Sequence, residues 1–355
     1  MNFANQLQTQ GAQLATDGIP LHFGDLAAEY DAALEAAVLL VRSHEGRLEM
    51  TGRDRLALIH RISTNHVESL PAGTGAATVF TNANARILDR VVVVSRPERA
   101  LVITEPGRGV LLEAYLRRNI FFNDEVQLVN LTGDTVQFAL HGPQADAVVT
   151  AIVPDAAALP LFGSAEVSIA DQPVMFIRNK PLASAHWTVI LPAAGAAPVW
   201  QAIMTAGATY GLIPAGSLTY NTLRIRAGRP GVGRELSEVY NPLEVGLWDE
   251  ISFNKGCYTG QEIIARMESR NRLARVMVRL TLQSPVEAPV DLSYEGRIIG
   301  RITSSVTTPR GEHLALGIVK PPVAVAEHTL SAGPQAVEAT ILGLAAVPPP
   351  MVEQM

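Results

Sequence analysis

The last quarter of the chain constrains the fold most strongly. From Arg275 onward the sequence predicts five short strands and no helix. Their sequences are "RVMVRLTL", "PVDLSYEG", "RIIGRITSSV", "HLALGIVK" and "VEATILG". Turns rich in Gly, Pro and Ser separate them at short intervals, which is typical of a small antiparallel barrel. We therefore expect residues 275–347 to form a C-terminal β-barrel and residues 348–355 to form a tail.

Before Arg275, predicted strands and helices are interleaved. Strands such as "RILDRVVVVS" and "TVQFALHG" alternate with helices expected at residues 25–34, 107–119 and 217–227. The order is not a strict βαβ repeat, so it favours an α+β fold over a doubly wound sheet. A connection rich in Pro and Ala lies at residues 153–161. We therefore expect an N-terminal α+β domain at 1–153 and a second α+β domain at 154–274.

Composition excludes several classes of protein. A single cysteine in 355 residues excludes an internal disulfide and an all-cysteine metal site, and the eight histidines form no HxxxH or HExxH pair. A net charge of −6 argues against a general nucleic-acid-binding protein. The longest apolar runs, such as "AVLLV", are too short to span a membrane. With no secretion or transit signal at the N-terminus, we expect a cytoplasmic protein.

The one cysteine lies in the segment "SFNKGCYTGQEIIAR", residues 252–266. Gly256 and Gly260 allow the backbone around Cys257 to turn tightly and expose the thiol. A helix is predicted from Gln261 onward, and Lys255 lies two residues before the cysteine. Helix amides and a nearby cation both lower the pKa of a thiol and favour the reactive thiolate. The alternative is a buried cysteine that packs as a small apolar residue.

The same segment resembles a known family signature. "KGCYTGQE" is similar to the motif K-G-C-Y-x-G-Q-E of the YgfZ branch of the folate-binding YgfZ/GcvT family. Further segments are similar to this family in the same order. They are "LIHRISTNHV", "VFTNANARILDRVVV", "ALHGP", "LRIRAGRPGVGREL", "NPLEVGL" and "GRITSSV". The resemblance implies a GcvT-like three-part α+β fold around a central channel, with a C-terminal antiparallel β-barrel.

The resemblance also implies a function. Members of the YgfZ branch support the assembly or repair of iron–sulfur clusters in other enzymes, with tetrahydrofolate as the suspected cofactor. The expected partners are therefore folate and iron–sulfur client or assembly proteins. The Cys257 thiolate would then act as a transient cluster ligand or exchange a thiol adduct, with no permanently bound metal. Two alternatives stay open: a folate-dependent aminomethyltransferase or demethylase of the glycine-cleavage T-protein type, and a scaffold for which the thiol is dispensable.

Residues carried over from the family complete the candidate site. Asp89 falls where the transferase has paired aspartates, but Arg90 stands in place of the second acid. Arg226 stands where the family often has a glutamate that holds the pterin. Because a guanidinium only donates hydrogen bonds, Glu235 or backbone carbonyls would have to hold the pterin instead. Arg226 would then favour a carboxylate or a phosphate.

Other residues near Cys257 are expected to support it. Tyr258 and Gln261 are candidates for orienting the site, although Tyr258 is equally consistent with packing beneath the loop. An arginine-rich run is a candidate docking surface for anions or an acidic partner, with a solvated face as the alternative. Its members are Arg266, Arg270, Arg272, Arg275 and Arg279.

Overall fold

The computed structural model describes residues 3–182, 184–270 and 272–346. The chain forms two compact units, each built from several segments. Unit 1 comprises Met1–Ile62, His66–Thr78 and Arg90–Leu223. Unit 2 comprises Ser63–Asn65, Val79–Asp89 and Arg224–Met355. The predicted boundaries at 153/154 and 274/275 remain predictions, and the predicted tail at 348–355 lies outside the described residues.

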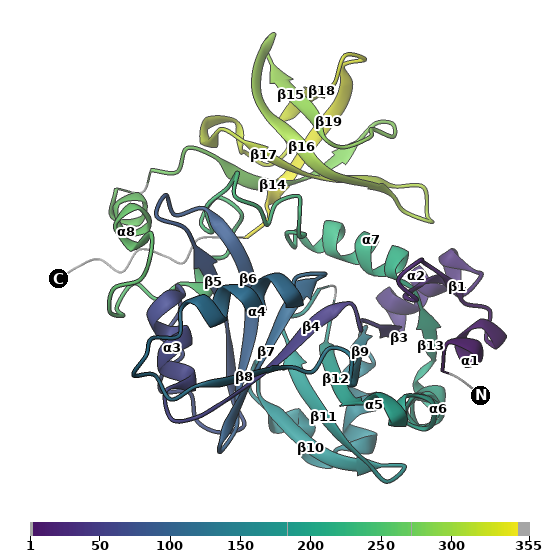
Figure 1. The fold of residues 1–355 in the computed structure, drawn as a ribbon. Coiled ribbons are helices and arrows are strands. Elements are labelled where there is room, and N and C mark those ends of the chain that lie inside the picture. Colours follow the sequence, from purple (N-terminus) through teal and green to yellow (C-terminus); the bar gives the residue numbers. More distant parts are fainter. Residues whose placement is uncertain (1–2, 183, 271, 347–355) are drawn as a thin grey trace. The chain divides into compact units, whose positions relative to one another are not determined.

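Unit 1 contains a six-stranded sheet with the order β10-β11-β12-β9-β3-β13 (Figure 1). Its strands are β10 (Ser164–Ile169), β11 (Gln172–Asn179), β12 (His186–Pro192), β9 (Thr135–His141), β3 (Ala37–Val41) and β13 (Leu212–Ala215). The pairings are antiparallel except that β13 runs parallel to β3. Helices α5 (Ala145–Ile152) and α6 (Ala196–Gly207) pack together, and the core beside them contains Phe138, Trp187 and Trp200. Every residue of β3 is buried, as expected for its continuous apolar sequence.

A five-stranded sheet has the order β5-β6-β7-β4-β8. Its strands are β5 (Gly75–Thr81), β6 (Ile87–Ser95), β7 (Arg99–Pro106), β4 (Glu45–Thr51) and β8 (Gln127–Asn130). Helix α4 (Gly109–Arg118) contacts β4, β7 and β8, and α3 (Arg55–Ile62) contacts β7. Because β3 ends at Val41 and β4 begins at Glu45, a turn of three residues joins the six-stranded sheet to the five-stranded sheet. That turn positions the candidate site described below.

The remaining elements of unit 1 are short. They are α1 (Phe3–Thr9), β1 (Gln13–Leu14), β2 (Pro20–His22), α2 (Leu26–Glu35), the 3-10 helices η1 (Pro154–Ala158), η2 (Ala193–Gly195) and η3 (Ala208–Tyr210), and the beginning of α7 (Ser217–Ala227). Asp25 caps α2, since its carboxylate accepts a hydrogen bond from the backbone N–H of Ala28 at 2.9 Å. Within the described residues, no helix combines the length and the apolar character needed to cross a membrane.

Unit 2 contains the predicted barrel, which is closed with the order β14-β17-β16-β15-β18-β19. Its strands are β14 (Val276–Leu282), β15 (Val290–Tyr294), β16 (Arg297–Thr307), β17 (His313–Val319), β18 (Thr329–Ala332) and β19 (Val337–Leu344). All pairings are antiparallel, and the interior is filled by apolar side chains such as Val278, Leu280 and Leu292. The predicted five strands are therefore confirmed, and β18 is added to them. Its sequence "TLSA" is too short and too polar to stand out.

Unit 2 also contains helix α8 (Gln261–Ser269) and the turns between α7 and the barrel. Segment Val79–Asp89 belongs to this unit because Val79 and Ile87 pack with Leu316 and Ile318 of the barrel and with Leu236. The predicted combination of mixed helices and sheets with a C-terminal antiparallel barrel is thus confirmed. Helix α4 begins two residues later than expected, because Gly107 has a left-handed φ of 72° and lies outside the helix.

Candidate functional site

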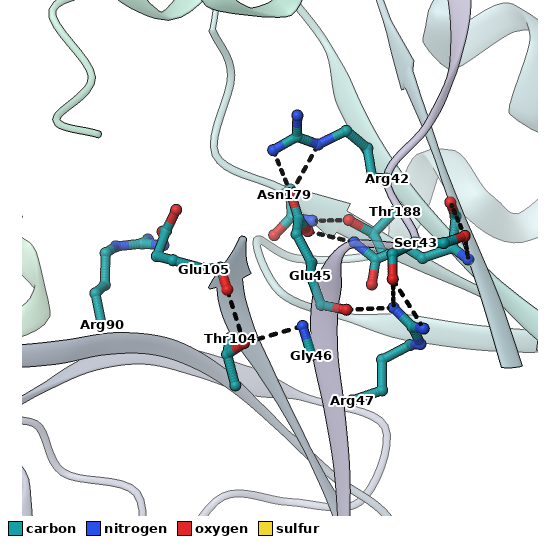
Figure 2. Close-up of polar contacts among 11 residues, drawn as sticks. Arg42, Ser43, Glu45, Gly46, Arg47, Arg90, Thr104, Glu105, Asn179 and Thr188 are labelled. Atoms are coloured by element: carbon teal, nitrogen blue, oxygen red, sulfur yellow. Dashed lines mark hydrogen bonds and ion pairs between the residues drawn. The ribbon is translucent and has the colours of Figure 1, made fainter. Parts of the chain in front are cut away.

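A group of polar residues lies in unit 1 around the turn from β3 to β4, and we call it the turn cluster (Figure 2). Its members come from β4, β6, β7, β9, β11, β12 and the turn itself. They are Arg42, Ser43, His44, Glu45, Gly46, Arg47, Arg90, Thr104, Glu105, Gln137, Asn179 and Thr188. Charged and amide groups rarely gather in an interior unless they are paired or bind something. This cluster is therefore a candidate ligand site.

Arg42 and Glu45 form the centre of the turn cluster. The Arg42 guanidinium contacts the Glu45 carboxylate at 2.6 Å and lies 3.6 Å from the centre of the Tyr220 ring. Burial acts to lower the pKa of Arg42, but Glu45, Tyr220 and Glu105 together raise it further above its ordinary value. Glu45 also accepts a hydrogen bond from the side-chain amide of Gln137. The pair is thus a fixed anchor for the groups around it.

Arg47 stabilises the turn itself. Its side chain is fully buried, and Figure 2 shows it directed toward the backbone of Ser43 and Glu45. Nη2 donates to the carbonyl of Thr132 at 2.8 Å, and Nε donates to the hydroxyl of Thr135 at 2.7 Å. Burial lowers the pKa of Arg47 to about 10, although the Glu45 charge opposes this. Since these partners are mainly carbonyl and hydroxyl oxygens, we assign Arg47 a structural role.

His44 is the titratable side chain of the turn. Burial, followed by the positive charge of Arg42, lowers the pKa of His44 to about 3. Its imidazole is therefore neutral at physiological pH. Its Nδ1 is buried without a hydrogen-bond partner among the described residues.

The predicted site residue Asp89 lies on β6, followed by Arg90. Both side chains are buried, and Arg90 donates to the Glu105 carboxylate of β7 at 3.0 Å. The register that pairs Val91 with Thr104 places Arg90 opposite Glu105. Glu105 on the neighbouring strand thus pairs with Arg90, the residue that stands where the second acid was expected. By its contacts Asp89 belongs to unit 2, and its role toward folate stays a prediction.

Aromatic and imidazole rings lie near Arg42. The rings of His141 and His186 are stacked with their centres 4.1 Å apart, and Tyr220 approaches His141 at 5.6 Å. All three residues belong to unit 1. Flat rings beside a charged pair are suited to a flat polar heterocycle.

Unit 2 holds the predicted thiol site in the loop between residue 252 and α8, which we call the thiol loop (residues 252–260). Cys257 is exposed, so the alternative of a buried apolar cysteine does not hold. Gly260 adopts a left-handed φ of 85°, and an added Cβ would lie 2.8 Å from the carbonyl oxygen of Asn82. Gly256 has no atom within 4 Å of an added Cβ and is not at positive φ. Of the two glycines, only Gly260 is required by the backbone.

Lys255 connects the thiol loop to residues 63–65. Its buried ammonium donates to the carbonyls of Ser63 at 2.6 Å and Asn65 at 3.1 Å. It also lies 5.2 Å from the centre of the Tyr258 ring. These contacts direct Lys255 toward backbone oxygens, which supports an anchoring role. Its predicted effect on the thiol remains a prediction.

Tyr258 and Gln261 flank the cysteine on its C-terminal side. Tyr258 is buried against Ile264 and Leu243, and burial raises the pKa of Tyr258 to about 12. Packing beneath the loop, one of the two expected roles, therefore describes its position. Gln261 begins α8 and donates its side-chain amide to the carbonyl of Lys255 at 3.3 Å. Lys255, Cys257, Tyr258 and Gln261 thus lie close together because one short segment of sequence contains all four.

The other predicted residues of unit 2 make separate contacts. Glu235 is fully buried, accepts from the Ser304 hydroxyl at 2.7 Å and lies 3.5 Å from Arg224. Arg226 is 40% exposed and pairs with Glu312 at 2.8 Å. Arg266 pairs with Glu262 at 2.7 Å on the exposed face of α8. Their roles toward folate stay predictions, and these contacts account for their positions without a ligand.

The arginine-rich run does not form one surface of equivalent side chains. Arg275 donates to both carboxylate oxygens of Glu244, at 3.0 and 3.1 Å, and its guanidinium lies 4.9 Å from the Tyr240 ring centre. Arg270 and Arg272 are exposed. A docking role is thus best tested on these two. Among the described residues, no group of three or more His, Cys, Asp or Glu side chains is arranged to hold a metal ion.

Sequence reasoning missed Arg42, Glu45 and Gln137 of the turn cluster. The available signals were weak: charged residues directly after the apolar strand "AVLLV", and one glutamine inside the apolar strand "TVQFALH". Polar side chains at such positions are buried only where other groups provide hydrogen-bond partners for them. Gln137 lies 92 residues from Glu45 and 94 from Ser43 in the sequence, and only the folded chain shows that they meet.

Comparisons with known proteins agree with this fold. Residues 5–255 match the family described as the GCVT N-terminal domain. A chloroplastic protein of Arabidopsis thaliana, provisionally named a transferase, is 30% identical over 94% of this chain and 76% of its own length. The aminomethyltransferase of Moorella thermoacetica is 27% identical over 94% of this chain and 91% of its own.

A solved structure gives the same result. The glycine cleavage system aminomethyltransferase T from Bartonella henselae superposes with a TM-score of 0.84 at 21% identity, covering 97% of this chain and 96% of that one. This likeness confirms the predicted GcvT-like fold class. The chain belongs to the family defined by the GCVT N-terminal domain.

Proposed function

We propose that the chain is a folate-binding protein that supports the assembly or repair of iron–sulfur clusters in other enzymes through Cys257. The observation that carries this proposal is the exposed thiol inside the segment "KGCYTGQE", which resembles the signature of the YgfZ branch. Lys255 and Gly260 support it, because they hold the loop on either side of the cysteine. The proposed partners are folate and cytoplasmic iron–sulfur client or assembly proteins.

The residues of the turn cluster fit tetrahydrofolate, whose pterin ring carries N–H and amino donors beside a carbonyl acceptor. The fit rests on Gln137, whose buried Oε1 has no hydrogen-bond partner among the described residues and is suited to a donor. Arg42 and Glu45 add a donor and an acceptor at the same place. These three residues would hold the pterin, and tetrahydrofolate, when bound, supplies a carrier for one-carbon units. Arg226, which stands where the family often has a pterin-binding glutamate, pairs with Glu312.

The thiol would handle the cluster as cargo. One thiolate supplies one ligand, whereas an iron–sulfur cluster needs about four, so the others must come from the partner or from a small thiol. An exposed cysteine on an anchored loop is suited to such a shared, temporary contact. The proposal thus requires a reactive Cys257 and no stable cluster on the isolated chain.

A complementation experiment tests the proposal. Cells that lack this protein are supplied with wild type, Cys257→Ser or Gly256→Ala, and the activities of iron–sulfur enzymes are measured under oxidative stress. We expect rescue by wild type and by Gly256→Ala, which serves as the control for a change beside the thiol. Equal rescue by Cys257→Ser, at equal protein level, would remove the thiol from the function.

A second candidate is a folate-dependent aminomethyltransferase or demethylase. It is favoured by the aminomethyltransferases among the relatives, which match along most of the chain. The discriminating measurement is tetrahydrofolate-dependent one-carbon turnover by the purified protein. Turnover that persists in Cys257→Ala, together with failure of wild type to restore iron–sulfur enzymes, would favour this candidate.

A further inference from the structure

Gln137 is a buried amide on β9, and of the two ends of its amide group only the NH2 has a hydrogen-bond partner among the described residues. Its side chain has 0% exposure, and its Nε2 donates to Glu45. Its Oε1 has no hydrogen-bond partner among the described residues. Buried polar atoms nearly always have a partner, so an orphaned amide oxygen indicates a water or a ligand.

The orientation of this amide is fixed by its neighbour. A carboxylate only accepts hydrogen bonds, so the NH2 of Gln137 must face Glu45 and the oxygen must face away. The amide cannot be turned over without placing two acceptors against each other. Glu45 is in turn held by Arg42, which lies against the Tyr220 ring. The orphaned acceptor is therefore held in one direction by a chain of three side chains.

The surroundings of Gln137 favour a ligand over dry packing. Ser43, His44 and Glu45 beside it are only partly buried, and 16% of the Glu45 side chain is exposed. Nδ1 of His44 is a second buried nitrogen without a partner among the described residues. The imidazole of His44 is neutral near pH 7, because burial lowers its pKa to about 3. Two buried atoms without a partner among the described residues thus lie in or beside a turn whose side chains are partly exposed.

We propose that Oε1 of Gln137 accepts a hydrogen bond from an N–H or amino group of the pterin ring, which makes Gln137 a specificity-determining residue of this chain. The inference rests on the folate part of the proposed function and names the residue that reads the ring. The Gln137 amide thus accepts the hydrogen bond from the pterin, a role that Arg226 cannot take because a guanidinium only donates. A ligand without such a donor leaves the buried oxygen unsatisfied and binds more weakly.

Calorimetric titration of the full-length protein tests this inference. Wild type and Gln137→Met are each titrated with tetrahydrofolate and with p-aminobenzoylglutamate, which lacks the pterin ring. We expect Gln137→Met to weaken tetrahydrofolate binding by about tenfold or more and to leave p-aminobenzoylglutamate binding unchanged. Glu45→Gln, which frees the amide to turn over, should also weaken tetrahydrofolate binding and covers the case in which Gln137→Met does not fold.

Asn130→Leu is the matched control. The Asn130 amide also donates to a carboxylate, Glu113, at 3.0 Å, but its oxygen already accepts from the backbone N–H of Thr132 at 3.0 Å. This variant should lose stability and keep its affinity for tetrahydrofolate. If wild type binds neither compound, the folate part of the proposed function fails, and this inference with it. If wild type binds tetrahydrofolate and Gln137→Met binds it equally, or loses both compounds alike, only the inference is overturned.

Discussion

His44 shows how the turn cluster couples stability to pH. The folded state holds the pKa of His44 at about 3, far below its ordinary value, because the ring is buried and lies near Arg42. In the unfolded chain the same ring takes up a proton below a pH of about 6.5. Protonation therefore favours the unfolded chain, and the folded chain loses stability as pH falls from about 6.5 toward 3.

We predict that His44→Gln reduces the acid sensitivity of the protein. Between pH 7.5 and 4.5, wild type should lose up to about 2.7 kcal/mol more unfolding free energy than the variant, since each of the two pH units below about 6.5 contributes up to about 1.4 kcal/mol. Urea unfolding of both proteins at the two pH values measures the difference. The same loss in both proteins would show that His44 is protonated in the folded state as well.

The two glycines beside Cys257 make a second prediction at the residue scale. Gly260→Ala forces a side chain into a left-handed conformation and against the carbonyl of Asn82, so we expect a loss of about 2 kcal/mol or more. Gly256→Ala meets nothing within 4 Å and should change the unfolding free energy by less than about 0.5 kcal/mol. Urea unfolding of the two variants provides the test, and equal losses would contradict the described loop.

At the scale of elements, the thiol loop depends on Lys255 as an anchor. Lys255→Met removes two charge-assisted hydrogen bonds to Ser63 and Asn65, and we expect a loss of about 2–3 kcal/mol of unfolding free energy. We also expect faster proteolysis in residues 252–260, because the loop opens more often. Lys320→Met, at an exposed lysine, is the control. A variant as stable and as protease-resistant as wild type would argue against anchoring.

Elements with a regular apolar pattern were predictable, and the turn cluster was not. The five barrel strands and α4 follow from periodicity and turn residues alone. Cys257, Lys255 and Gln261 come together because they are nearly consecutive, so one segment of sequence contains most of that site. Arg42 and Gln137 meet only because β3 and β9 are neighbours in the sheet. Glu235 was named from the sequence, but its partners were not. Arg224 and Ser304 explain its burial, and no sequence pattern indicated these two residues.

At the scale of the whole molecule, the chain passes repeatedly between its two units. It does so at residues 62–63, 65–66, 78–79, 89–90 and 223–224. Strands β5 and β6 thus begin in one unit and end in the other, and Val79 and Ile87 complete an apolar cluster of unit 2. Neither unit is a continuous piece of sequence. Because β5 and β6 cross between the units, we expect unfolding of unit 1 to disturb Val79 and Ile87 in the core of unit 2.

We predict a single cooperative thermal transition for the full-length protein. Calorimetry should give equal calorimetric and van't Hoff enthalpies, although chains of this length often unfold in steps. Val79→Ala, at a fully buried position, should move the whole transition to lower temperature by removing about 2 kcal/mol of stability. Val325→Ala, at an exposed position, should leave it in place. Two resolved transitions, only one of which responds to Val79→Ala, would contradict this coupling.

The exposed Cys257 has a practical consequence, because it is the only thiol in 355 residues. A maleimide dye or a nitroxide spin label will attach at one defined position without any engineered cysteine. The label reports directly on the loop next to α8, so its spectrum can follow partner or ligand binding in the natural sequence. For the same reason, two chains handled in air can join through one intermolecular disulfide. A reducing agent during purification keeps the thiol available for labelling.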